Sequence, residues 1–338
     1  MLDRFATFLD QHQKVLLTTH ENPDGDGTGS LVGLAHYLRL QGKEVRIVVT
    51  PSIPPFLAFL DVEGRMERFE PQGRHAALAE WPDAWVLVDA SEPQRLGPLQ
   101  PVFEASRAAK VCLDHHVKEA PRGFDLEFTD PTASASAQLV AKLAFQRLPR
   151  PLPLPMAQAL YAGLVDDTGN FRFSNATAEA HRLAADLIED GAEPARTYQQ
   201  LYHQGRPEKL MAKGRALENL AWQAEGRYAR MHLTRSEMEA LGAVHADLEG
   251  LVNQPLEVAG VEVSALLEEL EDGRIKVSLR SRERVNVQAV ASGFGGGGHV
   301  LAAGLRLPGP LASACSQVDE AVLTRLALDL GPEVSLRP

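Results

Sequence analysis

The chain has 338 residues, of which 44% are hydrophobic and 23% charged, so it can bury a sizeable core and two domains are expected. Its formal net charge is −11, which argues against a protein that coats long nucleic acid, because such proteins are usually basic. A small anionic substrate stays open, since bound metal ions add positive charge locally.

The first 20 residues contain only a brief apolar stretch and carry Asp3, Arg4 and Asp10, a pattern typical of neither a signal peptide nor a membrane span. We therefore expect no membrane association. Cys112 and Cys315 stand in unrelated contexts, so a disulfide framework or a zinc site is not indicated. Two buried small residues in a reducing cytoplasm are the simpler interpretation, and we expect a cytoplasmic protein.

Short apolar runs alternate with helical patterns in the first part of the chain. The expected elements, in order, are a strand at 14–20, a helix at 27–41 and strands at 44–49, 85–90 and 110–116. Strands that alternate with helices predict a mostly parallel sheet. Ligands of such sheets lie beyond the carboxyl ends of the strands.

The later sequence predicts more helices and then a second set of strands. In chain order these are helices at 132–148 and 156–165, a charged helical region at 177–223, β-like runs at 228–233, 260–266 and 274–280, and a closing helix near 317–329. We therefore expect an α/β protein with two domains. A parallel sheet flanked by helices would occupy 1–185, a helical connector 186–225, and a smaller α/β domain 226–338.

Acids and histidines stand where several of these elements end. They are His20, Asp24, Asp26, Asp89, Asp114, His115, His116, Asp166 and Asp167. Together they offer enough oxygen and nitrogen ligands for two divalent metal ions, and two metals held close together are a device for cleaving phosphate esters with water. Simpler interpretations exist for single members: residues 22–25 are also a good turn sequence, and a lone aspartate such as Asp89 is usually a cap or turn residue.

The chemistry of the residue types suggests roles for some members of this set. A carboxylate that bridges two metals must be central, and Asp89 is our candidate. Neighbouring histidines in an extended segment point opposite ways, so we assign His115 to a metal and His116 to a substrate phosphate. Asp114 would orient a histidine, as carboxylates commonly do. A solvated acid–histidine turn is an equally good interpretation of these three residues alone.

Two acids of this set, Asp166 and Asp167, follow the predicted helix at 156–165. Negative charge at the C-terminus of a helix is unfavourable because it opposes the helix dipole, and a bound cation would compensate this unfavourable interaction. One of the two acids could instead be simply solvated.

A run of four glycines, Gly295 to Gly298, precedes His299. Consecutive glycines cost conformational entropy, and in return they allow close backbone approach and present N–H groups to phosphate oxygens. A flexible linker is the alternative, but the apolar sequence on both sides opposes it. Arg280 follows a predicted strand and could hold a phosphate with its planar guanidinium. Phosphate-loop, nucleophile-elbow and dinucleotide-binding patterns are absent from the sequence.

These motifs resemble those of the DHH phosphoesterases. HENPDGD, LVDASEP, LDHH and LVDDTGNF are similar to motifs one to four of that family, in the family's order, and SLRSRERVNVQAVASGFGGGGHVLAAG is similar to the signature of the attached DHHA1 domain. The resemblance spans almost the whole chain. With no additional domain, the size resembles the stand-alone nanoRNases, which are bifunctional oligoribonucleases and 3′-phosphoadenosine 5′-phosphate (pAp) phosphatases.

The resemblance implies a role for each matching residue. One manganese would be held by His20, Asp24 and Asp89, and the other by Asp26, Asp89, His115 and Asp167. Catalysis would involve Asp89, Asp114 and His116, and substrate would contact His116, Arg280, Ser281, Gly296, Gly297, Gly298 and His299. Asp167 is chosen over Asp166 because it directly precedes Thr168, although the family often has a small or hydroxylated residue where Asp166 stands.

The resemblance also implies an activity. It is hydrolysis of very short RNA, pAp and linear or cyclic dinucleotides by a water activated between two Mn²⁺ or other divalent ions, and a homodimer is a family-level expectation. Three alternatives compete with it. A RecJ-like exonuclease on single-stranded DNA is opposed by the acidic charge, a family pyrophosphatase by the GGGGH segment, and an inactive nucleotide-binding protein by the intact ligand set.

Overall fold

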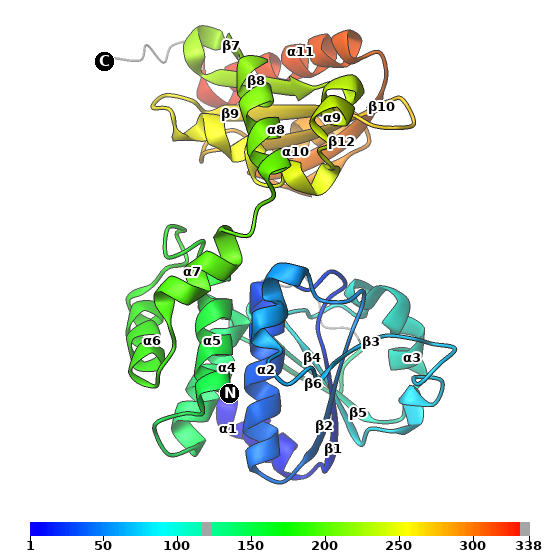
Figure 1. The fold of residues 1–338 in the computed structure, drawn as a ribbon, viewed down its shortest axis with the longest axis vertical. Helices are drawn as coiled ribbons and strands as arrows, with labels where there is room; N and C mark the ends of the chain where they lie inside the picture. Colours follow the sequence, from blue (N-terminus) through cyan, green and yellow to red (C-terminus); the bar gives the residue numbers. More distant parts are fainter. Residues whose placement is uncertain (117–122, 332–338) are drawn as a thin grey trace. The chain divides into compact units, whose positions relative to one another are not determined.

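The computed structural model describes residues 1–116 and 123–331, and the chain divides into two compact units, Met1–Gln204 and Gly205–Pro338 (Figure 1). The division lies inside the segment that the sequence predicted as a connector. Helix α7 (Pro194–Tyr202) belongs to the first unit and α8 (Pro207–Glu218) to the second. The expected α/β class is confirmed in both units.

The first unit is built on a parallel sheet of six strands in the order β3-β2-β1-β4-β5-β6. The strands are β1 (Lys14–Thr18), β2 (Glu44–Val49), β3 (Met66–Arg68), β4 (Ala84–Val88), β5 (Ala109–Asp114) and β6 (Leu126–Thr129). The chain runs outward from β1 through β2 to β3 and then returns to the other side of β1 as β4. The gap between β1 and β4 is therefore the switch point at which open α/β sheets bind ligands.

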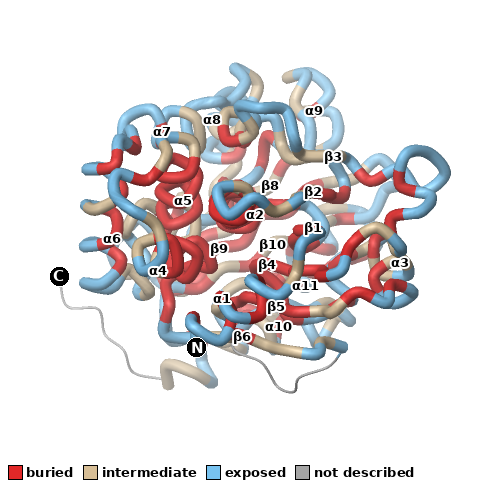
Figure 2. The backbone as a smooth tube through the Cα atoms, turned by 90° about the horizontal axis from the view of Figure 1, so that it is seen from below, coloured by how far each residue is buried: buried red, intermediate tan, exposed pale blue. Residues whose placement is uncertain are grey.

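Helices cover both faces of this sheet. They are α1 (Leu2–Asp10), α2 (Gly25–Leu40), α3 (Gln100–Ala105), α4 (Ser136–Arg147), α5 (Leu154–Asp167), α6 (Ala178–Glu189) and α7, with short 3-10 helices at Pro55–Leu60, Leu78–Glu80 and Pro93–Leu99. Alternate residues of β1 enter different cores: Val15 and Leu17 pack toward α2, α4 and α5, and Leu16 packs on the side of α3. Burial on both faces explains why the strands are continuously apolar. Buried residues accordingly concentrate on the central strands and on α2, α4 and α5 (Figure 2).

Small residues bring α2 and α5 into close contact. A Cβ on Gly29 would lie 2.3 Å from the Ala159 carbonyl oxygen, and one on Gly33 would lie 2.4 Å from Leu160 Cδ2. Neither position can hold a side chain at this helix spacing. The close packing matters for the site because the first turn of α2 and the last turn of α5 carry several of its acids.

The second unit is built on a six-stranded mixed sheet in the order β11-β12-β10-β9-β8-β7. Its strands are β7 (Ala221–Gln223), β8 (Tyr228–Leu233), β9 (Val263–Glu269), β10 (Arg274–Ser281), β11 (Gly297–His299) and β12 (Ala302–Pro308). Its further helices are α9 (Arg235–Leu241), α10 (Val287–Gly293) and α11 (Leu311–Leu330), with 3-10 helices at Ala224–Gly226, His245–Leu248 and Leu251–Glu257. Only β8 and β9 pair in parallel.

The two faces of this second sheet differ. One face forms a continuous core with α10 and α11 through residues such as Val277, Leu279 and Leu305. On the other face, Met231 of β8 and Leu266 of β9 pack against α8 and α9. The glycine run was expected to be a loop, but its second half forms β11 and pairs with β12. The two cysteines are buried and do not form a disulfide bond, as predicted. Within the described residues, no helix is long and apolar enough to cross a membrane.

Candidate metal centre

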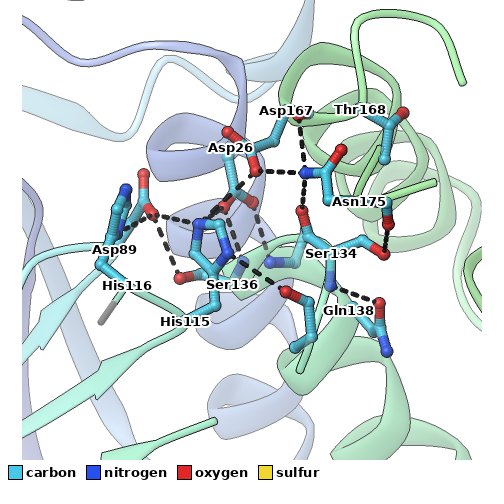
Figure 3. A network of polar contacts seen from close by, with 12 residues as sticks. Asp26, Asp89, His115, His116, Ser134, Ser136, Gln138, Asp167, Thr168 and Asn175 are labelled. Carbon is cyan, nitrogen blue, oxygen red and sulfur yellow. Dashed lines mark hydrogen bonds and ion pairs between the residues drawn. The ribbon is translucent and has the colours of Figure 1, made fainter. Parts of the chain in front are cut away.

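The predicted acids and histidines of the first unit come together at the carboxyl edge of its parallel sheet. His20 follows β1, Asp89 follows β4 and His115 follows β5. The start of α2 adds Asp24 and Asp26, and the last turn of α5 adds Asp167. The full set is His20, Asp24, Asp26, Asp89, His115 and Asp167. Figure 3 shows Asp26, Asp89, His115 and Asp167 directed toward one another from four different elements.

The first donor set consists of His20, Asp24 and Asp89. His20 Nε2 lies 3.4 Å from Asp24 Oδ2 and 3.6 Å from Asp89 Oδ2. The other ring nitrogen, Nδ1, lies 3.0 Å from the Glu21 carbonyl oxygen, to which only a protonated Nδ1 can donate. With the proton of a neutral ring on Nδ1, the lone pair lies on Nε2, which faces the two carboxylates. Asp24 is held in place because its Oδ1 accepts from the Gly27 N–H at 2.9 Å and caps α2.

The second donor set surrounds His115. Its Nε2 is buried without a hydrogen-bond partner and lies 3.5 Å from Asp89 Oδ1, 3.5 Å from Asp167 Oδ2 and 3.8 Å from Asp26 Oδ2. These distances exceed ordinary hydrogen bonds. They suit ligands of a shared divalent ion, because each ligand atom would lie about 2.1 Å from the ion and about 3 Å or more from the next ligand.

Asp89 stands between the two sets. Its Oδ2 faces His20 and its Oδ1 faces His115, while the Ser136 hydroxyl donates to Oδ1 at 3.2 Å. The backbone of Asp89 has a φ of 59°, in the left-handed region that non-glycine residues rarely adopt. Such a conformation persists where the surroundings enforce it, and it is concentrated at functional sites.

Asp26 is fixed by the start of α4. Its Oδ2 accepts from the Ser136 N–H at 2.6 Å and its Oδ1 from the Ala137 N–H at 2.8 Å. The positive end of the α4 dipole therefore faces this buried carboxylate. These backbone donors and the Ser136 hydroxyl were missed by the sequence analysis. The run of small residues at 133–137 was the available signal.

Asp26 and Asp167 have a raised pKa because they are buried beside other acids. Burial and the charges of Asp89 and Asp167 hold the pKa of Asp26 well above its usual range. Burial and the Asp89 charge raise the pKa of Asp167 to about 6 although the nearby His115 opposes them. Burial also acts to raise the pKa of Asp89, but the polar and charge interactions with the nearby His115 and His20 rings outweigh it and keep this pKa below its usual value.

The histidines respond in the opposite sense. Burial acts to lower the pKa of His20, yet hydrogen bonds to Asp24 and Asp89 raise it to about 10. Contacts with Asp89 and the charge of Asp167 likewise raise the pKa of His115 despite its burial. A cluster that draws protons onto its histidines in this way is one that a divalent cation would stabilise, so the donor set fits metal binding.

Asp114 and His116 form a supporting pair beside the cluster. Asp114 Oδ1 accepts from the backbone N–H groups of His115 at 2.7 Å and His116 at 3.1 Å, and it lies 2.8 Å from His116 Nδ1. Asp114 thus orients His116 and not the His115 ring. The expectation that the two histidines point opposite ways was wrong, since their ring centres are 4.4 Å apart. The reason is that β5 ends at Asp114, so the alternation of a strand does not extend to them.

The two neighbouring acids at the end of α5 have different partners. Asp167 faces His115, whereas Asp166 Oδ2 accepts from the Gly25 N–H at 2.7 Å, at the start of α2. A Cβ on Gly25 would lie 2.6 Å from the Asp166 side chain, so glycine is required there. Asn175 also supports Asp167, because its amide donates to the Asp167 carbonyl oxygen at 3.1 Å. Asn175 had no signal in the sequence.

The predicted substrate residues of the second unit are not all equivalent. Register pairing places Arg280 on β10, Ala302 on β12 and His299 on β11 side by side on one sheet face. Ser281 lies on the opposite face, where its hydroxyl donates to the Val285 carbonyl oxygen at 2.6 Å. That hydroxyl is therefore used within the fold.

Comparison with known proteins identifies the family. The model of the DHH family, N-terminal domain, matches residues 14–164, and the DHHA1 domain matches residues 238–324. A curated relative from Thermus thermophilus, named bifunctional oligoribonuclease and PAP phosphatase NrnA, is 35% identical over 317 residues, covering 92% of this chain and 90% of the relative. The chain belongs to the DHH–DHHA1 phosphoesterases. It is a hydrolase of phosphoester bonds.

Other known proteins are similar over nearly the same span of this chain. A structure from Bacteroides fragilis described as an exopolyphosphatase-related protein has a TM-score of 0.89 at 26% identity, covering 97% of this chain and 96% of that chain. A cyclic-di-AMP phosphodiesterase from Geobacillus thermodenitrificans is 27% identical over 314 residues, covering 88% of this chain and 45% of the relative. A RecJ structure from Thermus thermophilus shares the fold, with a TM-score of 0.57 at 14% identity, covering 96% of this chain and 55% of that chain.

Proposed function

We propose that this DHH–DHHA1 phosphoesterase hydrolyses very short oligoribonucleotides to mononucleotides and dephosphorylates pAp. The reaction would use two divalent metal ions, with manganese as the preferred candidate, at the carboxyl edge of the parallel sheet. The observation that carries the proposal is the geometry of Asp89. One of its carboxylate oxygens faces His20 and the other faces His115. A carboxylate that links two donor sets in this way is suited to bridge two metals.

The donor sets define the proposed ligands. His20, Asp24 and Asp89 would hold one ion, and Asp26, Asp89, His115 and Asp167 would hold the other. Both histidines leave Nε2 free because their Nδ1 atoms lie against backbone carbonyl oxygens, Glu21 at 3.0 Å and Ala133 at 3.3 Å. Imidazole and carboxylate ligands suit manganese among other divalent ions. Asp167, and not Asp166, is the proposed ligand because only Asp167 faces His115.

When bound, two such metal ions would supply an activated water and neutralise charge on the phosphoryl group. The residues of the chain position the reactants. Asp114 fixes the His116 ring through the bond to Nδ1, and the His116 side chain is 46% exposed beside the buried cluster. His116 is therefore placed to contact a phosphate oxygen through Nε2 while Asp114 holds its Nδ1. The pKa of Asp114 stays below its usual value because the His116 hydrogen bond outweighs the effect of burial.

The second unit would hold the nucleotide. Arg280 has no carboxylate partner among residues 1–116 and 123–331; its guanidinium donates only to the Leu279 carbonyl oxygen. His299 is exposed on the same sheet face. These two side chains, with the backbone of Gly296, Gly297 and Gly298, are the proposed phosphate and nucleotide contacts.

The names of the relatives support a second substrate class. The NrnA relative is named for oligoribonuclease and PAP phosphatase activities, and the Geobacillus relative for cyclic-di-AMP hydrolysis. Linear and cyclic dinucleotides are therefore candidates in addition to short RNA and pAp. The likeness to RecJ at 14% identity concerns the fold alone, so a single-stranded DNA exonuclease is the weaker proposal.

The test is product analysis with purified protein, manganese and a 5′-phosphorylated diribonucleotide, with a chelator as control and the matching deoxyribonucleotide and pAp in parallel. Release of mononucleotides that stops with chelator supports the proposal. Hydrolysis of the deoxyribonucleotide alone would favour the exonuclease alternative. Intact diribonucleotide and intact pAp in the presence of manganese would contradict the proposed substrates and favour a binding protein.

A further inference from the structure

The second sheet has an open half that carries cations. Lys276, Ser278 and Arg280 of β10 alternate with core residues, so they share the face opposite α10 and α11. Register pairing adds Arg306, Gly304 and Ala302 of β12 to this face, and Gly297 and His299 of β11. Each of these residues is at least partly exposed. We call this surface the open sheet face.

Two glycines on the open sheet face are not required by the fold. A Cβ on Gly297 would meet nothing within 4 Å, and one on Gly304 would make an ordinary contact of 3.5 Å with the Val277 carbonyl oxygen. Neither has the positive φ that favours glycine. Gly296 and Gly298 differ, because a Cβ there would lie 2.3 Å from the Gly304 oxygen and 2.5 Å from the Ala302 oxygen. Packing therefore explains Gly296 and Gly298, whereas packing does not explain Gly297 and Gly304, which leave a part of the face without side chains that we call the bare floor.

Cations flank this bare floor. Lys276 of β10 and Arg306 of β12 are direct cross-strand partners, a like-charge pairing that is unfavourable without an anion between the two. Arg306 makes no hydrogen bond or ion pair with any residue that the structure describes. Lys276 Nζ lies 2.5 Å from His245 Nε2, whose Nδ1 lies 2.6 Å from Glu268. Glu268 is also the cross-strand partner of Lys276 on β9, so His245 stands between the two, and Lys276 itself forms no ion pair with any residue in the described part of the chain.

Arg274 provides an internal contrast. It lies on the same strand and the same face, two residues before Lys276, but it is paired with Asp272, whose Oδ2 lies 2.7 Å from Arg274 Nε. The hydrogen bonds between Asp272 and Arg274 lower the pKa of Asp272, and the charge of Arg306 makes a smaller contribution in the same direction. The available positive charge of this region therefore resides on Arg306 and Lys276.

Gly304 of this floor and both cations line a hollow of about 330 Å³. Its lining includes Lys276, Arg306, Gly295, Gly296, Gly304 and Phe294. Phe294 is half-buried and adds an apolar aromatic wall. Positive charge beside an aromatic ring is the composition with which proteins bind single-stranded nucleic acid, since the charge holds the backbone and the ring stacks on a base.

We propose that Lys276 and Arg306, over the bare floor of Gly297 and Gly304, form a second phosphate subsite that binds a more distant nucleotide of a short RNA. This inference rests on the proposed function, in which Arg280 and His299 bind the first phosphate. Lys276 and Arg280 are four positions apart on β10, which is about 13 Å along an antiparallel strand. The two phosphates of pAp sit on one ribose and are too close together to reach both positions. The subsite therefore favours substrates of more than one nucleotide over pAp.

The test compares Arg306→Gln with Arg274→Gln, a matched loss of one guanidinium from the same face. The readout is kcat/KM for a 5′-phosphorylated triribonucleotide divided by kcat/KM for pAp. We expect Arg306→Gln to lower this ratio about tenfold, as the loss of one charge-assisted phosphate contact implies, through KM of the triribonucleotide. Arg274→Gln should leave the ratio as in the parent protein. Equal ratios in all three proteins, or equal falls in both variants, would overturn the subsite.

A binding measurement separates failure of the subsite from failure of the proposed function. Fluorescence anisotropy of a 3′-labelled, 5′-phosphorylated triribonucleotide, in chelator, reads affinity without hydrolysis. Weaker binding by Arg306→Gln in a protein that hydrolyses neither substrate would retain the subsite and reject the proposed function. Hydrolysis by the parent protein with unchanged binding by Arg306→Gln would reject the subsite and retain the proposed function.

Gly304→Ala gives an independent reading of the floor. The added methyl group has room against the Val277 carbonyl oxygen, so the unfolding temperature should stay that of the parent protein. It would nevertheless occupy the floor and weaken triribonucleotide binding. Unchanged binding by a folded Gly304→Ala variant would contradict the bare-floor argument.

Discussion

The carboxyl edge of the first sheet and the open face of the second are built in opposite ways. The first gathers buried acids, and its histidines turn Nε2 toward carboxylates within 3.4–3.8 Å. The second gathers partly exposed cations, of which Lys276, Arg280 and Arg306 form no ion pair with any described residue, above glycines that the fold does not require. A net charge of −11 describes neither surface. The overall acidity argued against a long polyanion, but the two kinds of charge are separated, so one surface suits cations and the other suits anions.

This difference predicts different consequences of substitution. In the first region, backbone N–H groups hold Asp24 and Asp26, the Ser136 hydroxyl contacts Asp89, and backbone carbonyl oxygens face both histidine rings. Removal of a donor should therefore abolish metal binding and activity. In the second region, side chains act singly at an exposed surface, so their removal should change affinity for the nucleotide while metal binding persists.

The largest effect is expected for Asp89→Asn. This substitution weakens one side of the carboxylate that faces both donor sets, so we expect hydrolysis to fall by more than the roughly tenfold to hundredfold loss that accompanies removal of a group that only supports a ligand. Ser136→Ala is the matched control, because it removes the bond to Asp89 Oδ1 and leaves the carboxylate. Initial rates with saturating manganese measure both. Hydrolysis by Asp89→Asn at the parent rate would contradict the bridging role.

The next contrast is between the neighbouring acids of α5. Asp167→Asn should abolish activity because Asp167 faces His115, whereas Asp166→Asn should be milder because an amide oxygen can still accept from the Gly25 N–H. Rates of the two variants, measured side by side, decide the choice. The reverse order would make Asp166 the ligand.

Asp167 also predicts how the metal-free protein responds to pH. Its pKa is raised from its usual 3.8 to about 6, mainly by burial and by the Asp89 charge. The folded state therefore binds this proton more tightly than the unfolded state, and the stability it contributes is present below the usual pKa and lost as pH rises through about 6. In chelator, Asp167→Asn should be more stable than the parent protein near pH 8, by on the order of 2 kcal/mol, with little difference near pH 4. Thermal unfolding at the two pH values measures this, and a less stable variant at pH 8 would show that the acid is not destabilising.

The smallest of these effects is expected in the second region. His299→Ala should raise KM for nucleotides about tenfold, as expected when one hydrogen bond to a charged group is lost. Manganese binding should persist, because His299 lies in the other unit and outside both donor sets. Steady-state kinetics with a parallel metal titration check this. Loss of metal binding would place His299 in the metal centre instead.

Much of the first region could be predicted from the sequence because its donors follow apolar strands, and the carboxyl ends of parallel strands meet at one edge. His20, Asp89 and His115 were grouped on that basis. The orientation of His115 and His116 could not be predicted correctly, since it depends on β5 ending at Asp114. The donors from the Ser136 and Ala137 N–H groups were missed because every residue except proline has such a group, and only tertiary packing directs it to Asp26.

The second region was less predictable. The four glycines suggested a phosphate loop, but only the structure shows that Gly296 and Gly298 are required by close approach to β12 and that Gly297 is not. Arg306 gave no signal, because an exposed arginine on a strand is ordinary in a sequence. It becomes informative only with Lys276 paired opposite it and Gly304 beside it.

The most direct test of the central claim is the number of manganese ions bound per chain, measured by titration of chelator-treated parent protein and Asp89→Asn under the same conditions. The two donor sets that share Asp89 predict two ions for the parent protein and a loss of tight binding at both positions in the variant. Two tightly bound ions in Asp89→Asn, or a single ion in the parent protein, would contradict a centre bridged by Asp89.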